Sequence, residues 1–190
     1  MKRLWTPWRM AYLQAPKESK RRGCIFCTKM REHTAKDREN LVLWRGARAF
    51  VVLNLYPYSN GHVMVVPYQH TSELDALDSE TLKEMMLLVG TSIRALRALM
   101  DPQGFNLGAN LGRVAGAGVE DHVHIHIVPR WGGDTNFMPV LADVRMIPEL
   151  LPQTYDGLLA AFHAEPKQAR QAPSRNRRKK NEKRDVMGAR

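Results

Sequence analysis

Apolar residues run in short stretches between residues 41 and 67, each bounded by polar or turn-forming residues. The stretches are LVLW (41–44), AFVVLN (49–54) and HVMVVP (62–67), and the turn-rich YPYSNG separates the last two. β-Branched and aromatic residues in runs of this length favour strands, and the intervening turn residues favour hairpins. The pattern predicts consecutive antiparallel strands.

Residues 79–100 follow a different period. Apolar side chains recur there at helical spacing, at Leu82, Met85, Met86, Val89, Ile93, Leu96 and Met100. Asp78 or Ser79 can cap the start, and Asp101-Pro102 ends the run. This predicts a long helix whose methionine-rich stripe packs in the core, and a second helix is expected at about 148–163. Because strands, a helix and again strands follow one another, we expect an α+β fold with an antiparallel sheet.

The net charge of +10 suggests a nucleic-acid partner until its distribution is considered. Residues 167–190 hold ten Lys or Arg against Glu182 and Asp185, so +8 of the charge lies in this segment. We therefore expect an N-terminal arm at 1–23, one domain at 24–164 and a disordered basic tail at 165–190. The tail is either a solvated run of charge or a sequence-independent contact with nucleic acid or polyphosphate.

The chain has no stretch that approaches the roughly 18 apolar residues of a membrane span, and its opening MKRLWTPWRM lacks the apolar core of a signal peptide. We expect a soluble, cytoplasmic protein without a membrane partner. Its two cysteines, Cys24 and Cys27, are three positions apart. In a reducing compartment this spacing favours metal or redox chemistry over a structural disulfide.

The segment HVHIHIV (122–128) carries the most chemical information. In a strand, His122, His124 and His126 would share one face, and the intervening apolar residues would share the other. Such a row of imidazoles can hold a metal ion. A neutral histidine is also a competent nucleophile toward phosphorus near pH 7.

The residues before this segment favour phosphate chemistry. Asn110 precedes three glycines, Gly112, Gly116 and Gly118, within a short span. Glycines let backbone N–H groups approach an anion closely, and an asparagine amide adds a donor. Together with the three imidazoles, the turn indicates a phosphate-binding site.

The segment HVHIHIV resembles the signature of the histidine triad superfamily of nucleotide hydrolases and transferases. GHVMVVPYQH (61–70) resembles the second block of that family, and Asn54 stands eight residues before His62, where the family places an Asn or Asp on the ribose. Over roughly residues 5–160 the chain is similar to the bacterial branch of diadenosine tetraphosphate phosphorylases. The resemblance implies the histidine triad fold, with about five strands and one long helix, and a homodimer.

The resemblance also implies a role for each matching residue. The triad His122, His124 and His126 would be catalytic, with His124 attacking the α-phosphorus of a dinucleoside polyphosphate or purine nucleotide to form a nucleotidyl-histidine intermediate. Inorganic phosphate or water would then release the nucleotide. The residues expected to bind the substrate are Asn54 on the ribose, His62 behind the imidazoles, and Asn110, Gly116, Gly118 and His126 around the phosphoryl oxygens.

A structural zinc ion is implied as well. In zinc-containing branches of the superfamily a CxxC, a later His and the first His of the triad bind the ion, and Cys24, Cys27, His70 and His122 stand at matching places. Two thiolates and two imidazoles form a good tetrahedral zinc set, and a site filled by four protein ligands is structural. His33 is the main rival for the fourth position.

One departure from the family leaves the reaction open. Several relatives carry a Gln and a hydroxyl residue just before the triad, whereas this chain has Ala117-Gly118-Val119. The acceptor, phosphate or water, is therefore undecided. We expect diadenosine tetraphosphate phosphorolysis. The alternatives are a hydrolase of dinucleoside polyphosphates or nucleoside phosphoramidates, and a nucleotide-sensing or RNA-associated binding module.

Overall fold

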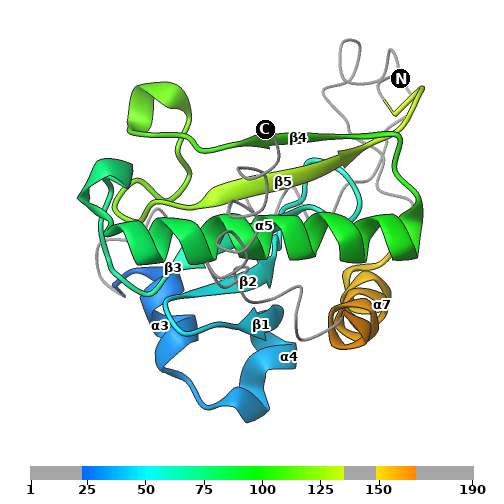
Figure 1. Cartoon of the computed structure of the whole chain (residues 1–190), viewed down its shortest axis with the longest axis horizontal. Coiled ribbons are helices and arrows are strands. Elements are labelled where there is room, and N and C mark those ends of the chain that lie inside the picture. The colour runs from blue at the N-terminus through cyan, green and yellow to red at the C-terminus, as the bar shows by residue number, and fades with distance from the viewer. Residues whose placement is uncertain (1–22, 135–148, 166–190) are drawn as a thin grey trace, which may run out of the picture.

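The computed structural model describes residues 23–134 and 149–165 of the chain. They form a five-stranded antiparallel sheet in the order β1-β2-β3-β5-β4 (Figure 1). The strands are β1 (Val42–Arg45), β2 (Ala49–Leu53), β3 (Val63–Pro67), β4 (Gly104–Gly108) and β5 (Ile125–Arg130). The predicted α+β class and the consecutive strands β1 to β3 are confirmed. The arm up to residue 22 and the tail from residue 166 lie outside the described residues.

The long helix α5 (Ser79–Met100) has the predicted bounds. Asp78 is its N-cap and accepts a 2.9 Å hydrogen bond from the Thr81 N–H, while Asp101 ends it in the left-handed conformation at φ 45°. The helix crosses one face of the sheet (Figure 1). Its apolar stripe faces the strands. Met86 is the exception: the prediction placed it in the core, but it is 54% exposed, because it lies at the margin of the stripe.

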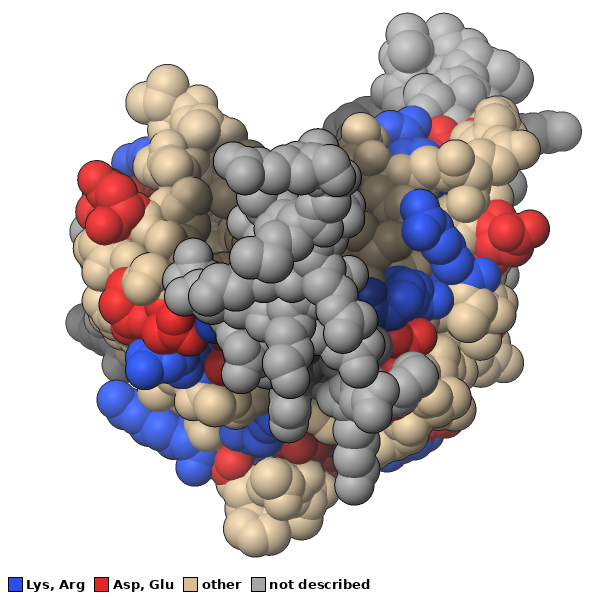
Figure 2. Space-filling model, in the orientation of Figure 1, with Lys and Arg blue, Asp and Glu red and all other residues tan. Residues whose placement is uncertain are grey.

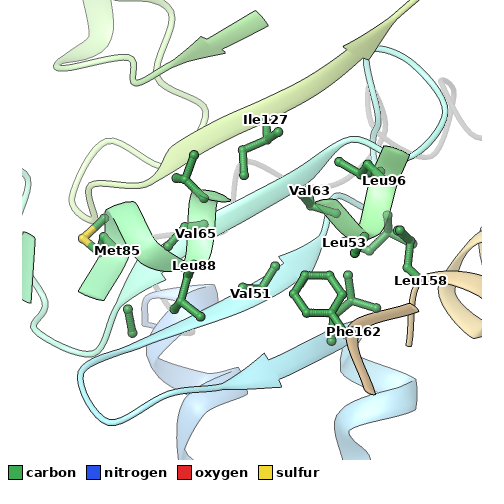
Figure 3. Close-up of a cluster of buried hydrophobic side chains, with 14 of the residues drawn as sticks. Val51, Leu53, Val63, Val65, Met85, Leu88, Leu96, Ile127, Leu158 and Phe162 are labelled. Atoms are coloured by element: carbon green, nitrogen blue, oxygen red, sulfur yellow. The ribbon is translucent and has the colours of Figure 1, made fainter. Parts of the chain in front are cut away.

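The main core lies between this helix and the sheet. Figure 3 shows Met85, Leu88 and Leu96 of α5 packed over apolar residues of three strands, namely Val51, Leu53, Val63, Val65 and Ile127. The methionine at position 85 is fully buried, as expected of a core residue. Burial of each large side chain contributes roughly 1.5–3 kcal/mol to the stability of the fold. Because a slip of one residue would turn these side chains to the other face of the sheet, their burial fixes the register of the central strands.

Helix α7 (Leu151–Ala164) closes the edge of this core beside α5 and β1. It begins three residues later than the predicted start, with Pro152 in its first turn, where a missing N–H costs nothing. Leu158 and Phe162 point into the core (Figure 3). Gly157 permits a close approach, because a Cβ there would lie 3.0 Å from the side chain of Leu99 on α5.

The opposite face of the sheet carries a smaller cluster. Phe50, Val52, Met64 and Val66 of β2 and β3 pack there against Phe26 of the short helix α3 (Ile25–Arg31). The chain then runs through η1 (Thr34–Lys36) and α4 (Asp37–Asn40) to β1. Two further 3₁₀ turns are η2 (Leu74–Ala76), before α5, and η3 (Arg113–Ala115), in the glycine-rich segment. The sequence pattern predicted none of these short elements.

Charge is mixed over the described surface. On the face shown in Figure 2, Lys and Arg side chains alternate with Asp and Glu, in keeping with the small charge left once residues 167–190 are set aside. No helix in the described ranges is both long and apolar enough to cross a membrane.

Candidate functional site

The histidine segment lies on the face of the sheet opposite α5. Only His126 belongs to β5, because this strand begins at Ile125, so the prediction of one strand from residue 122 is wrong at its start. His122 lies in a bend and His124 directly precedes the strand, and this segment is anchored by a 2.7 Å hydrogen bond from the Val123 N–H to the Thr71 carbonyl. Val123 and Ile127 face the α5 core as expected.

The imidazoles do not form an open row. His122 is 0% and His124 is 4% exposed, while His126 is only half-buried. Burial follows from α3, whose Phe26 ring lies 5.0 Å from the ring of His124 and 5.4 Å from that of His122. Sequence reasoning missed Phe26, and the only available signal was its position inside the CxxC.

A backbone carbonyl sets the tautomer of His124. Its Nδ1 lies 2.9 Å from the carbonyl oxygen of His122. A carbonyl oxygen can only accept, so Nδ1 of the neutral ring carries the proton. The Nε2 atom of His124 therefore keeps its lone pair, which is the state a nucleophile needs.

His126 takes the opposite tautomer. The backbone N–H of Tyr58 donates to Nδ1 of His62 at 3.1 Å, so His62 carries its proton on Nε2. This Nε2 lies 2.9 Å from Nδ1 of His126 and donates to it. The proton of His126 is thereby left on Nε2, where it can be given to an oxygen of a bound anion.

Burial also keeps these rings neutral. It lowers the pKa of His62 to about 3, and His126 and His124 nearby add to the shift. Burial, with a smaller effect of His124, lowers the pKa of His126 to about 4. Burial lowers the pKa of His124 as well, against an opposing effect of its hydrogen bond to the His122 carbonyl. Each shift favours the form with a free lone pair near neutral pH.

Asn54, which the family resemblance assigns to the ribose, lies beside His62 in the structure. Its Nδ2 is 3.2 Å from Nδ1 of His62, and its Oδ1 accepts a 3.0 Å bond from the Tyr56 N–H. Both polar ends of the amide are thus oriented by the loop between β2 and β3. Tyr58, which the sequence analysis did not single out, places its ring 4.8 Å from that of His62.

The glycine-rich segment folds back on itself. Asn110 donates from Nδ2 to the Gly116 carbonyl at 3.3 Å, and the Gly116 N–H donates to the Arg113 carbonyl at 3.0 Å. Gly116 has φ 87°, which explains the need for glycine at that position. Its N–H is already used within η3, so an anion would meet other donors here, among them the second N–H of Asn110 and the exposed backbone at Gly118.

Four side chains from distant parts of the chain converge beside the triad. The thiols of Cys24 and Cys27 and the rings of His70 and His122 place their ligand atoms within 4.8 Å of one another. Nδ1 of His122 lies 3.3 Å from Sγ of Cys24 and 3.2 Å from Nδ1 of His70. Sγ of Cys27 is 3.4 Å from Nδ1 of His70.

These spacings fit a tetrahedral metal ion. Bonds of about 2.0–2.1 Å to nitrogen and about 2.3 Å to sulfur put two nitrogens about 3.3 Å apart and a nitrogen and a sulfur about 3.5 Å apart. The Nε2 of His122 donates to the Pro67 carbonyl at 2.9 Å, so Nδ1 is unprotonated and faces the cluster. Burial, followed by the neighbouring Cys24, raises the pKa of the Cys27 thiol, an effect that a bound cation would reverse. His33 lies elsewhere, exposed, and caps η1.

The chain is similar in sequence to known proteins. The chain is 43% identical over 159 residues to the AP-4-A phosphorylase of Mycobacterium tuberculosis, covering 81% of this chain and 80% of that protein. It is 32% identical over 108 residues to the adenosine 5'-monophosphoramidase hnt1 of Schizosaccharomyces pombe, covering 57% and 74%.

The fold also has solved counterparts. A zinc-bound histidine triad protein from Mycobacterium smegmatis superimposes with a TM-score of 0.59 at 27% identity, covering 74% of this chain and 94% of the other. The family model of the HIT domain matches residues 35–133, which include β1 to β5 and the whole triad. The chain belongs to the HIT domain family, the histidine triad proteins.

Proposed function

We propose that this protein is a nucleotidyl transferase that cleaves diadenosine tetraphosphate by phosphorolysis through His124. The observation that carries the proposal is the opposed pair of tautomers on neighbouring rings: a free lone pair on Nε2 of His124 and a proton on Nε2 of His126. A nucleophile and a hydrogen-bond donor thus lie side by side, with ring centroids 4.6 Å apart. The similarity of the chain to the M. tuberculosis AP-4-A phosphorylase supports diadenosine tetraphosphate as the substrate.

The reaction has two displacements at the same phosphorus. Nε2 of His124 forms a bond to the α-phosphorus, the bond from that phosphorus to the bridging oxygen breaks, and ATP leaves. An oxygen of inorganic phosphate then attacks the same phosphorus, the bond to His124 breaks, and ADP leaves. His126 donates its Nε2 proton as a hydrogen bond to phosphoryl or leaving oxygens, where negative charge must be stabilised.

The remaining predicted residues take binding roles in this proposal. Asn54 holds the ribose and steadies His62, and His62 fixes the tautomer of His126. Asn110 and the backbone around Gly116 and Gly118 hold phosphate oxygens, which the position of β4 next to β5 supports. The triad residue His122 acts through its carbonyl on His124.

We further propose that the Cys24, Cys27, His70 and His122 cluster holds a structural zinc ion. All four positions of the tetrahedron are filled by protein atoms, so such an ion would have no open position for substrate. It would fix the segment that carries His124. The proposal also includes a homodimer, supported by β4, which is an edge strand of the sheet within residues 23–134 and 149–165 and carries the exposed Leu107.

A cytoplasmic location completes the proposal, and the free thiols of Cys24 and Cys27 suit a reducing compartment. The basic segment from residue 167 to residue 190 is proposed to contact nucleic acid or polyphosphate. Removing it should leave turnover intact if the protein is an enzyme and abolish activity if it is a nucleotide-sensing or RNA-associated module. Binding through it should weaken with salt.

A mass analysis of products tests the main proposal. The protein is incubated with diadenosine tetraphosphate with and without inorganic phosphate. ATP plus ADP that appear only with phosphate would support phosphorolysis. ATP plus AMP in both conditions would make the protein a hydrolase with the same nucleophile. The variant His124→Asn should abolish turnover, whereas His163→Asn, an exposed histidine on α7, should not.

A second candidate is a nucleoside phosphoramidate hydrolase. The relative in S. pombe is described as an adenosine 5'-monophosphoramidase, and Ala117-Gly118-Val119 offers no side-chain donor to a particular leaving group. Turnover of an adenosine phosphoramidate but not of diadenosine tetraphosphate would favour this candidate.

A further inference from the structure

Phe26 lies between the two cysteines of the CxxC, and its ring packs against two histidines of the triad. Its side chain is 1% exposed. Its ring lies 5.0 Å from the ring of His124, tilted by 55°, and 5.4 Å from that of His122 in an edge-on arrangement. One aromatic side chain of α3 therefore contacts both the proposed nucleophile and the residue whose carbonyl sets its tautomer.

The ring of His124 is enclosed on more than one side. His126 contacts it edge-on, at 4.6 Å and an interplanar angle of 71°, and the His122 carbonyl holds its Nδ1–H. The hydrogen bond at Nδ1 opposes a flip of the imidazole, but it still lets the ring tilt, and a tilt weakens the bond that sets the tautomer. Contacts with Phe26 and His126 remove that freedom and so direct Nε2 of His124.

Helix α3 is attached to the rest of the fold at both ends, and these contacts fix the position of Phe26. At the start of the helix, the thiols of Cys24 and Cys27 meet His122 and His70. At its end, the guanidinium of Arg45 on β1 donates to three backbone carbonyls, those of Lys29, Met30 and Glu32, at 3.0–3.3 Å. Arg45 is itself paired with Asp37 at 2.7 Å.

We propose that Phe26 is a positioning residue that holds the His124 imidazole with its Nε2 lone pair directed at the substrate. The inference rests on the proposed function, since it assigns a partner to the same nucleophile. It also gives the CxxC helix a role in the reaction, because the helix that carries two of the candidate metal ligands also carries the side chain that orients the nucleophile.

The test compares Phe26→Leu with Phe50→Leu. Phe50 is a matched control, because it is fully buried in the same cluster and contacts Phe26 and Tyr68 but has no ring contact with a histidine among the described residues. Phe26→Leu should lower kcat for diadenosine tetraphosphate by about tenfold or more while KM and bound metal stay unchanged. Phe50→Leu should keep kcat within about twofold of the wild type.

Ring-nitrogen NMR supplies a readout that does not need turnover. Long-range ¹H–¹⁵N spectra distinguish the two neutral tautomers, and the His124 signals are assigned by their loss in His124→Asn. Phe26→Leu should mix or broaden the Nδ1–H tautomer of His124, and Phe50→Leu should leave it as in the wild type. If Phe26→Leu does not fold, Phe26→Met takes its place.

The two proposals fail in different ways. A wild-type protein without turnover would defeat the proposed function, and the spectra would then decide the role of Phe26. Unchanged His124 signals, or equal values of kcat in the two leucine variants, would overturn the inference. Loss of metal from Phe26→Leu along with loss of kcat would overturn it too, because the ring would then act on the metal cluster.

Discussion

His62 donates from its Nε2 to Nδ1 of His126 across 2.9 Å, although the two residues are 64 positions apart. His62 is fully buried and makes this bond from the end of the loop between β2 and β3. The backbone N–H of Tyr58 donates to Nδ1 of His62, which leaves the proton of the His62 ring on Nε2. A main-chain atom thus decides, through two imidazoles, which nitrogen of His126 faces the substrate.

Replacing His62 should therefore lower kcat through His126. Leucine at position 62 cannot donate to Nδ1 of His126, so we expect a loss of about 10- to 100-fold in kcat with diadenosine tetraphosphate. Glutamine at position 62 keeps an N–H donor, and His62→Gln should lose less. Steady-state kinetics of both variants check this, and equal losses would argue against a role for the donated hydrogen bond.

The pH dependence of kcat/KM should reflect the lowered pKa values. The free enzyme needs His124 unprotonated, and burial lowers the pKa of this ring below the ordinary 6.5. His126, with a pKa of about 4, and His62, with a pKa of about 3, also stay neutral well below pH 6.5. The rate should stay level as pH falls through 6.5 and decline only below it. An acid limb centred at 6.5 or above would contradict this expectation.

Stability should fall with acid for the same reason. The pKa of His62 is about 6.5 in the unfolded chain and about 3 in the fold, so the unfolded state binds more protons between those values. This contribution is fully present above pH 6.5 and is lost as pH falls, at about 1.4 kcal/mol per pH unit for one proton. Urea unfolding at pH 7.5 and pH 5 measures it. The difference in the free energy of unfolding between the two pH values should be smaller in His62→Leu, which has no imidazole at position 62 to protonate.

The sequence predicted the parts of this fold that are governed by periodicity. Helix α5 has an uninterrupted apolar stripe and a capping aspartate, and its predicted bounds match those observed. Helix α3 has only two turns and owes its position to contacts far along the chain, such as that between Cys24 and His122, 98 residues apart. No local pattern contains that information, so neither Phe26 nor the burial of the triad could be foreseen.

The site was predictable to a similar degree. The resemblance to the histidine triad superfamily singled out Asn54 and His62, which the structure places in contact, and it grouped the four candidate metal ligands, whose ligand atoms converge. The hydrogen bonds that fix the tautomers could not be predicted, because they involve the carbonyl of His122 and the N–H of Tyr58. Backbone atoms carry no sequence signal of their own.

Removal of the metal ligands should uncouple α3 from the triad. Cys27→Ser takes one thiolate from a buried position of the cluster, and we expect it to abolish stoichiometric zinc by elemental analysis. Because binding free energy of a structural ion adds to folding free energy, the melting temperature should fall as well. Turnover should drop, since Phe26 on the same helix would lose its fixed place against His124.

His33→Ala is the matched control for this experiment, because the sequence offered His33 as a rival ligand while the structure places it at the N-cap of η1. This variant should retain zinc. Loss of the cap should lower the free energy of unfolding by only roughly 1 kcal/mol or less, so the melting temperature should change little. Zinc lost from His33→Ala but kept by Cys27→Ser would show that the ion is held by another set of residues. Zinc lost from Cys27→Ser with kcat unchanged would instead separate the metal cluster from the chemistry, and the orientation of His124 would then depend on the strand and the His122 carbonyl alone.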